Sequence, residues 1–356
     1  MRWAIMRPNL HPSLVNGRFG DPALFVGRLH RRGALLFDLG DLGPLGARDL
    51  LRVTHVFVTH CHMDHFVGFD ALLRVSVGRE KSVAMIGPPG FRERVHHKLQ
   101  AYEWDLVDRY DTDLVFHVTE LWPDGRALSA CFRFSQAFAW EEGAVTISEE
   151  GVVASEGDFE VRAALLDHHG PCLGYAVAER AHVNVWKNRL DARSLRTGPW
   201  LQALKQAVAQ GRGGDHPIPL PDGGAAPLGE LRDLVSVTRG QKIAYVTDVA
   251  DTPANREAIA ALAADADVFF IESRFAAADA AQARDRAHLT TRAAGEIARA
   301  AGARRIEPFH FSPRYEGEEE RMLGEARAAF AQPSREETAC QKEGGPKRSS
   351  GRPPAE

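Results

Sequence analysis

The sequence predicts an α/β fold in which two mixed β-sheets pack together and helices cover the outside. Two strand-rich halves support this prediction, because helical segments follow each of them and a stretch of different character, about 180–228, separates them. Hydrophobic residues make up 44% of the 356 residues, which is enough for a sizeable core in one large domain with extensions.

Strand signals dominate the first half of the chain, where β-branched and aromatic runs end in Gly, Pro or Asp. The predicted strands are 22–29, 34–41, 53–60, 83–91, 114–121, 159–166 and 173–179. The strand at 83–91 leads through a Pro/Gly turn into a helix that we expect over about 92–104.

The second half alternates strands with helices. Its predicted strands are 242–248, 267–273 and 304–311. One helix is expected over 253–266 with Pro253 at its first position, and another over 290–302 with Gly302 as its stop. The chain is therefore interpreted as one folded domain over 1–331, followed by a polar tail over 332–356 that we expect to be disordered.

Charge, cysteine usage and hydropathy exclude several classes of protein. The net charge is −4 and the isoelectric point is near 6.4, so any nucleic-acid binding must depend on a local basic patch. The four cysteines are scattered without CxxC spacing, which argues against a disulfide framework or a thiolate zinc site. The first residues contain no apolar core of signal-peptide length, and the sequence has no run of eighteen apolar residues. We therefore expect a cytoplasmic protein with no membrane partner.

Four metal-binding side chains are crowded together in the stretch 60-HCHMDH-65. If this stretch continues the preceding strand, His60, His62 and Asp64 point to one side and His65 lies on the turn. Imidazoles and a carboxylate this close would be unsatisfied in an ordinary core, whereas a divalent cation binds both kinds of group. A His-rich exposed loop is the alternative interpretation.

Three other segments carry a His or an Asp at the end of a predicted strand. They contribute His168, Asp248 and His310. Taken alone, each is more often a structural residue, because such residues commonly end strands and begin turns. Together with the stretch at 60–65, they supply the seven ligands that a two-metal site would need. His169 is the alternative to His168.

These residues carry a family resemblance. HxHxDH is the signature of the metallo-β-lactamase superfamily, within which the chain most resembles the ribonuclease Z family of tRNA 3′-processing endonucleases. The stretches that support the narrower resemblance are 168-HHGPCLGYAVAE-179, 189-RLDARSLRTGPWLQALKQAV-208, 285-DRAHLTTRAAGEIARAAG-302 and 309-FHFSPRY-315. The resemblance spans roughly residues 20–316 and implies a metallo-β-lactamase-like αββα sandwich for the hydrolase domain over 1–331.

The resemblance implies two divalent metal ions, with zinc expected and manganese or iron as alternatives. The implied ligands are His60, His62 and His168 for one ion, Asp64, His65 and His310 for the other, and Asp248 as a bridge between them. Asp38, at the end of the strand that begins at Ala34, is expected either to support a ligand or to serve as an ordinary strand-end carboxylate.

The implied activity is that of a metal-dependent phosphodiesterase that removes 3′ trailers from tRNA precursors. Two divalent ions about 3.5–4 Å apart can activate a water to hydroxide and neutralise phosphate oxygens. Asp64 is implied at the catalytic centre, and His288 is implied as the general acid that protonates the ribose 3′ oxygen, oriented by Glu272. The structural alternatives are a helix cap for His288 and a strand-end charge for Glu272.

The segment 180–228 resembles part of the family's substrate-binding arm. Residues 179–213 contain seven Lys/Arg and two acidic residues, a net charge of +5. The candidate arm residues are Lys187, Arg189, Gly198 and Pro199. A basic protrusion could hold tRNA phosphates without reading sequence, and a solvated linker is the alternative. The resemblance is also compatible with a homodimer.

Two departures from the family pattern bear on the substrate. Asp248 lies in Val-Thr-Asp-Val where the family has Ser-Gly-Asp-Thr, and the arm is shorter than usual. A small-molecule phosphodiesterase or another ester hydrolase on the same site is therefore the alternative function. A non-catalytic RNA-binding protein of this fold is the least favoured hypothesis, because the ligand set and His288 are all present.

Overall fold

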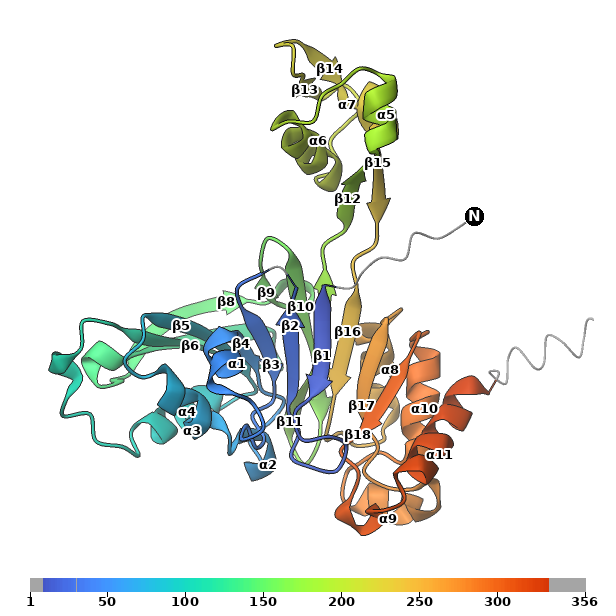
Figure 1. Ribbon diagram of the computed structural model, residues 1–356. Helices are drawn as coiled ribbons and strands as arrows, with labels where there is room; N and C mark the ends of the chain where they lie inside the picture. Colours follow the sequence, from blue (N-terminus) through green and yellow to red (C-terminus); the bar gives the residue numbers. More distant parts are fainter. Residues whose placement is uncertain (1–8, 30, 333–356) are drawn as a thin grey trace, which may run out of the picture.

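The computed structural model describes residues 9–29 and 31–332, and it confirms an α/β fold with two mixed sheets packed together and helices outside (Figure 1). Within these ranges, sheet 1 has eight strands in chain order and sheet 2 has six strands in the order β18-β17-β16-β11-β10-β9. The tail predicted over 332–356 lies outside the described residues, apart from Gln332.

Sheet 1 is parallel in its centre, from β3 to β6, and antiparallel towards both edges. Its strands are β1 (Leu10–Leu14), β2 (Leu24–Arg28), β3 (Ala34–Phe37), β4 (Val53–Phe57), β5 (Lys81–Gly87), β6 (Leu114–Leu121), β7 (Arg126–Arg133) and β8 (Glu141–Ile147). The helices between them are α1 (Ala47–Arg52), α2 (Met63–Phe66), α3 (Phe69–Ser76) and α4 (Phe91–Leu99).

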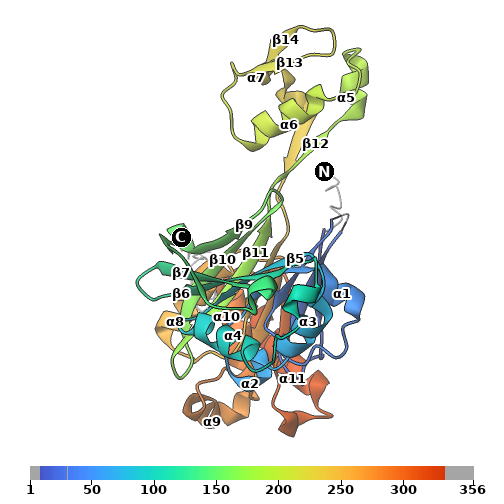
Figure 2. The same cartoon turned by 90° about the vertical axis from the view of Figure 1, so that its left-hand side faces the viewer.

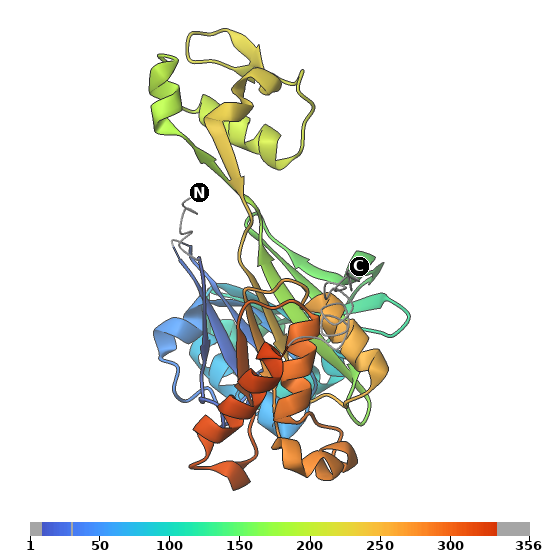
Figure 3. The same cartoon turned by 90° about the vertical axis from the view of Figure 1, so that its right-hand side faces the viewer.

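Sheet 2 pairs β16, β17 and β18 in parallel and its other strands antiparallel. Its strands are β9 (Val152–Ser155), β10 (Phe159–Asp167), β11 (Pro171–Glu179), β16 (Lys242–Val246), β17 (Val268–Glu272) and β18 (Ile306–Phe309). The helices of this half are α8 (Pro253–Leu262), α9 (Ala280–Asp285), α10 (Thr291–Ala300) and α11 (Glu319–Ala331). Figure 3 shows α10 and α11 on the outer side of this sheet.

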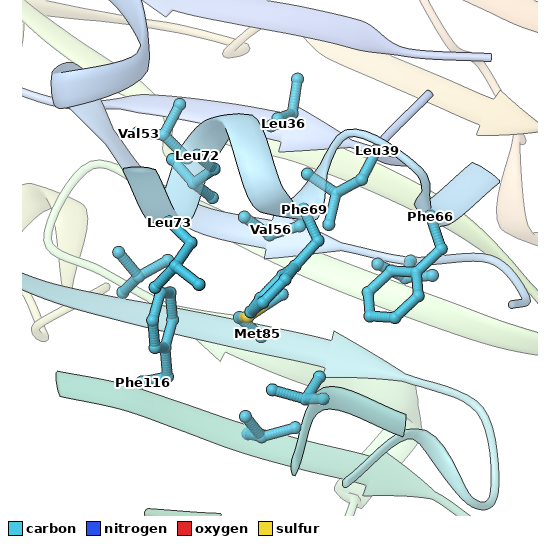
Figure 4. Close-up of a cluster of buried hydrophobic side chains, with 14 of the residues drawn as sticks. Leu36, Leu39, Val53, Val56, Phe66, Phe69, Leu72, Leu73, Met85 and Phe116 are labelled. Atoms are coloured by element: carbon cyan, nitrogen blue, oxygen red, sulfur yellow. The ribbon is translucent and has the colours of Figure 1, made fainter. Parts of the chain in front are cut away.

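Three layers of buried apolar side chains hold the domain together. Helices α1, α3 and α4 pack on the outer face of sheet 1, where Phe69 of α3 meets Met85 and Phe116 (Figure 4). The aromatic rings of Phe37 and Tyr245 meet between the two sheets, with ring centroids 5.8 Å apart. A third layer lies between sheet 2 and helices α8 and α10. Burial of these apolar surfaces is the main favourable term in folding.

In the second half, the start of α8 and the stop of α10 agree with the predicted signals, whereas α8 ends at Leu262, before the predicted end at residue 266. The hydroxyl of Thr252 accepts a hydrogen bond from the backbone N–H of Asn255, and Pro253 opens α8. Gly302, with φ +64°, follows the end of α10 in the left-handed conformation that glycine adopts without a steric penalty. The prediction was wrong for α4, which ends at Leu99, and the indole N–H of Trp104 donates back to the Leu99 carbonyl at 2.8 Å.

A small helical lobe projects from one end of the two-sheet body (Figures 1 and 2). A two-stranded ribbon carries it, formed by β12 (His182–Val185) and β15 (Val235–Thr238). The lobe contains α5 (Lys187–Ala192), α6 (Trp200–Ala209), β13 (Pro217–Pro219), β14 (Ala225–Pro227) and α7 (Leu228–Leu231). It has its own apolar core, in which Trp200, Leu204 and Leu228 are buried together. We call residues 182–238 the arm.

The described residues contain no helix that is both long enough and apolar enough to cross a membrane.

Candidate metal centre

The candidate metal ligands all lie in loops or at a helix start beyond the ends of strands. Strand β4 ends at Phe57, so His60 and His62 lie in the loop that follows it, and Asp64 and His65 lie on the short helix α2. The expectation that the ligands continue the strand was therefore wrong. A helical turn presents Asp64 and His65 together with the rings of the preceding loop, which strand alternation would not do.

The structure brings His60, His62, His168 and Asp248 into one group, with one donor atom of each within 4.8 Å of the others. Nε2 of His60 lies 2.9 Å from Nδ1 of His62. Oδ2 of Asp248 lies 3.7 Å from Nε2 of His60 and 3.6 Å from Nε2 of His168. Three imidazoles and one carboxylate at this spacing are a suitable donor set for a divalent transition metal.

A second group joins Asp64, His65 and His310, again with donor atoms within 4.8 Å of one another. Oδ2 of Asp64 lies 3.7 Å from Nε2 of His65 and 3.5 Å from Nε2 of His310. Oδ1 of Asp248 lies 3.5 Å from Nε2 of His65 and 2.7 Å from Nδ1 of His310. Asp248 therefore faces the first group with one oxygen and the second group with the other, as a bridging carboxylate would.

His169, the alternative third-motif ligand, lies outside both groups. Its side chain is exposed, and its Nε2 lies 3.2 Å from the carbonyl oxygen of Arg286. His168, by contrast, is buried, with Nδ1 2.8 Å from the carbonyl of Ala287 and Nε2 facing Asp248. That hydrogen bond orients the ring and leaves Nε2 available as a donor atom.

The cluster buries carboxylates and imidazoles together, and each kind of group stabilises the charge of the other. Burial opposes charge on His65, but the carboxylates of Asp248 and Asp38 raise its pKa well above its usual value. Burial also opposes charge on Asp248, but the imidazoles of His310 and His65 hold its pKa well below its usual value. Burial lowers the pKa of His60 to about 2, so that ring is neutral at pH 7. A bound divalent cation would supply positive charge between the carboxylates. The imidazoles that bind it would release their protons.

One ring atom in the cluster has no hydrogen-bond partner among the described residues. Nε2 of His65 is fully buried and unpaired, whereas buried polar atoms are ordinarily satisfied. Its Nδ1 is already 3.0 Å from the Asp38 carboxylate. A metal ion would satisfy Nε2. The residues present therefore fit a metal in two respects: the chemistry of the donor set, and a buried ring nitrogen that lacks a partner.

Asp38 connects the ligand loop to the body of the protein. Its Oδ1 accepts a hydrogen bond from the backbone N–H of Thr59 at 2.7 Å, and its Oδ2 lies 3.0 Å from His65 Nδ1, from the Thr59 hydroxyl and from the Tyr245 hydroxyl. The Asp38 side chain is fully buried between the sheets. Its contact with His65 suits the first of its two expected roles, support of a ligand from behind.

Three residues of the centre have left-handed backbone conformations that are uncommon for residues other than glycine. The φ angles are 58° at Asp38, 39° at Asp248 and 57° at His310. Asp38 and His310 are the first residues after β3 and β18, and Asp248 is the second residue after β16. At all three positions the chain turns sharply out of the sheet. Such conformations cost of order 1–3 kcal/mol each and persist where the surrounding structure enforces them.

His288 and Glu272 lie beside the metal groups. Oε1 of Glu272 lies 3.2 Å from Nδ1 of His288, and the rings of His288 and His168 are 4.9 Å apart between centroids. Glu272 is completely buried at the end of β17. Burial lowers the pKa of His288, but the carboxylates of Glu272 and Asp248 together prevail and raise it above its usual value. These carboxylates therefore favour the protonated form of the ring next to the cluster.

The candidate arm residues lie far from this centre. Lys187 and Arg189 are exposed on α5, and Gly198 and Pro199 form the turn into α6. Strand β11 begins beside the metal centre and ends at the arm, and its nine residues span about 30 Å. The whole arm carries seven Lys/Arg and five Asp/Glu, so its net charge is +2, less than the +5 of residues 179–213.

Sequence reasoning missed one charged residue at the centre. Arg274 follows Glu272 by two residues, and its Nη1 lies 2.7 Å from Nε2 of His310. It directly follows the predicted strand 267–273, but an arginine after a strand has no distinctive spacing to single it out.

Comparisons with known proteins agree with this fold. Residues 23–183 match the metallo-beta-lactamase superfamily, and residues 233–311 match a beta-lactamase superfamily domain. The chain is 32% identical over 318 residues to ribonuclease Z of Deinococcus radiodurans, covering 87% of this chain and 92% of the relative. It is 34% identical to ribonuclease Z of Thermobifida fusca, covering 83% and 81%. The crystal structure of human tRNase Z, short form, superposes with a TM-score of 0.50 at 18% identity, covering 86% and 92% of the two chains, and shares the fold.

Proposed function

Since the chain belongs to the ribonuclease Z family of the metallo-β-lactamase superfamily, we propose that it is an endonuclease that removes 3′ trailers from tRNA precursors. The observation that carries the proposal is the pair of ligand groups that share Asp248, with the His288–Glu272 pair beside them. This arrangement suits hydrolysis of a phosphodiester, because the site offers both a dinuclear cation site and a proton donor.

We assign the first ion to His60, His62 and His168, the second to Asp64, His65 and His310, and the bridge to Asp248. Zinc is the proposed metal, because imidazole nitrogen and carboxylate oxygen both suit it. When bound, two such ions supply an activated water nucleophile and neutralise the phosphate charge.

The chain's own residues then handle the leaving group. Water adds to phosphorus, the bond between phosphorus and the ribose 3′ oxygen breaks, and that oxygen needs a proton to become the tRNA 3′ hydroxyl. His288 faces Glu272 with Nδ1, so Nε2 is the atom from which it donates this proton. The trailer departs with the phosphate on its 5′ end.

The arm supports a large substrate. About 30 Å separates the arm from the metal centre. A substrate that contacts both in the same protein chain must therefore be an extended molecule. A cleft of about 670 Å³ lies where the arm meets the body, and its lining carries more cations than acids: Arg28, Arg31, Arg180 and Lys205 against Asp158 and Glu179. Cations in such a cleft would favour a polyanion and bind it without reading its sequence.

The decisive experiment is incubation of the purified, zinc-loaded protein with a 3′-extended tRNA precursor, with the cleavage position mapped on a sequencing gel. Cleavage that separates the 3′ trailer from the tRNA and leaves a 3′ hydroxyl on the tRNA is expected, and prior chelation of the metal should abolish it. Efficient hydrolysis of bis-p-nitrophenyl phosphate without any cleavage of the precursor would instead favour a small-molecule phosphodiesterase.

A further inference from the structure

Arg274 is a cation built into a centre whose other buried groups are arranged to hold cations. Its Nη1 donates to Nε2 of His310 at 2.7 Å, inside the second ligand group. Among the residues that the structure describes, no carboxylate lies within ion-pair distance of its guanidinium. A half-buried arginine ordinarily has an anionic partner, so this one lacks the partner that its charge requires.

The backbone at Arg274 is held rigidly. Its N–H lies 3.4 Å from Oε2 of Glu272, and its carbonyl accepts a hydrogen bond from the N–H of Ser312 at 3.0 Å. The next residue, Phe275, forms a parallel bridge with Thr290. The guanidinium is therefore aimed at the centre by a loop fixed on both sides, which is the support that a binding residue needs.

Metal binding would leave Arg274 without its present contact. The lone pair of His310 Nε2 cannot both ligate a metal ion and accept a hydrogen bond from Arg274. A guanidinium next to two divalent ions is unfavourable unless an anion lies between them. The chemistry that satisfies all these charges is a phosphate group, which guanidinium binds through paired N–H donors.

We propose that Arg274 binds a non-bridging oxygen of the scissile phosphate, and that this residue selects an anionic phosphodiester over a neutral ester. The inference rests on the proposed function insofar as it takes the substrate to be a phosphodiester. Arg274 would then contact the reacting phosphate directly, and its positive charge would favour an anionic group at the centre.

The test uses inorganic phosphate as the probe and the full-length, zinc-loaded protein. We expect Arg274→Ala to weaken phosphate binding, measured by isothermal titration, by about 10- to 100-fold, the range for loss of a hydrogen bond to a charged group. Arg274→Lys keeps the charge but loses the paired donors, so its affinity should be intermediate. Arg304→Ala is the matched control, because Arg304 is exposed and precedes β18 at the end away from His310.

Metal content measured on the same samples separates binding from structure. Two zinc ions per chain in Arg274→Ala together with weakened phosphate binding support the proposal. Unchanged phosphate affinity, or a loss of zinc that accounts for the weaker binding, overturns it. A wild-type protein that binds phosphate through Arg274 but does not cut a tRNA precursor would refute the proposed RNA substrate and leave this inference standing.

Discussion

Glu272 connects the proton donor and the metal bridge. Its Oε1 lies 3.2 Å from Nδ1 of His288 and accepts a hydrogen bond from the backbone N–H of Val249 at 2.7 Å, directly after Asp248. The carboxylate is completely buried at the end of β17. One side chain therefore contacts both the His288 ring and the backbone next to the bridging residue.

Glu272→Gln should shift the pH dependence of cleavage. Burial lowers the pKa of His288, and the carboxylates of Glu272 and Asp248 together raise it above its usual value, with Glu272 the larger contributor of the two. Removing the negative charge leaves burial dominant, so the His288 pKa falls and the ring loses its proton at a lower pH. The alkaline limb of the pH profile of kcat/KM for a tRNA precursor should therefore move to lower pH. An unmoved alkaline limb would show that His288 is not the group being titrated.

His288→Ala should separate substrates by their leaving groups. We expect a loss of about 10²- to 10⁴-fold on a tRNA precursor, whose ribose 3′ oxygen needs a proton, and a much smaller loss on bis-p-nitrophenyl phosphate. Zinc content should stay at the wild-type level. His97→Ala is a suitable control, since His97 is exposed on α4. Equal losses on both substrates would argue against the general-acid role.

His62→Ala should remove metal without unfolding the protein, because the side chain is exposed at the mouth of the centre. We expect lower zinc content by elemental analysis and near-complete loss of bis-p-nitrophenyl phosphate hydrolysis, with an unchanged thermal unfolding midpoint in the metal-free protein. Full zinc content at full rate would contradict the ligand assignment.

Asp38→Asn should weaken metal binding although Asp38 is not itself a ligand. The amide cannot accept all the hydrogen bonds that Asp38 receives from Thr59, His65 and Tyr245, so His65 loses its orientation. Zinc affinity, measured by competition with a chelator, should fall about 10- to 100-fold. Asp41→Asn, three residues away and exposed, should bind zinc like the wild type.

Removal of the arm should distinguish the two candidate substrates. His182 and Thr238 are paired across the ribbon, so residues 182–238 can be replaced by a short Gly/Ser link between Ala181 and Arg239. We expect precursor cleavage to be lost and hydrolysis of bis-p-nitrophenyl phosphate to be retained. Retained precursor cleavage would contradict a role for the arm in substrate binding.

The strands that carry the centre were predictable because their runs of β-branched and aromatic residues are strong local signals. The outer strands β7 and β8 were not predicted, since every residue of β8 is exposed and the strand lacks an apolar alternation. The small helices α1, α2 and α3 were missed because so few residues give little periodicity.

The ligand types were recognisable from the spacing of HxHxDH, but their arrangement depended on contacts between distant segments. The position of Asp64 on a helix follows from the sharp turn after β4, which local periodicity does not reveal. Arg274 was missed for the same reason, because its significance comes from His310, 36 residues further along the chain. The charge of the arm was overestimated because its closing half, which carries four acidic residues, was not counted.

The left-handed conformations at Asp38, Asp248 and His310 also have a consequence for engineering. Glycine would relieve the backbone strain at each position, so a redesign that weighs backbone conformation alone would favour replacing these three residues. Each replacement would remove a bridge, a ligand or the support of a ligand. Thermostabilised variants of this protein should therefore be selected with the backbone of these three turns held fixed, because stability and activity oppose each other there.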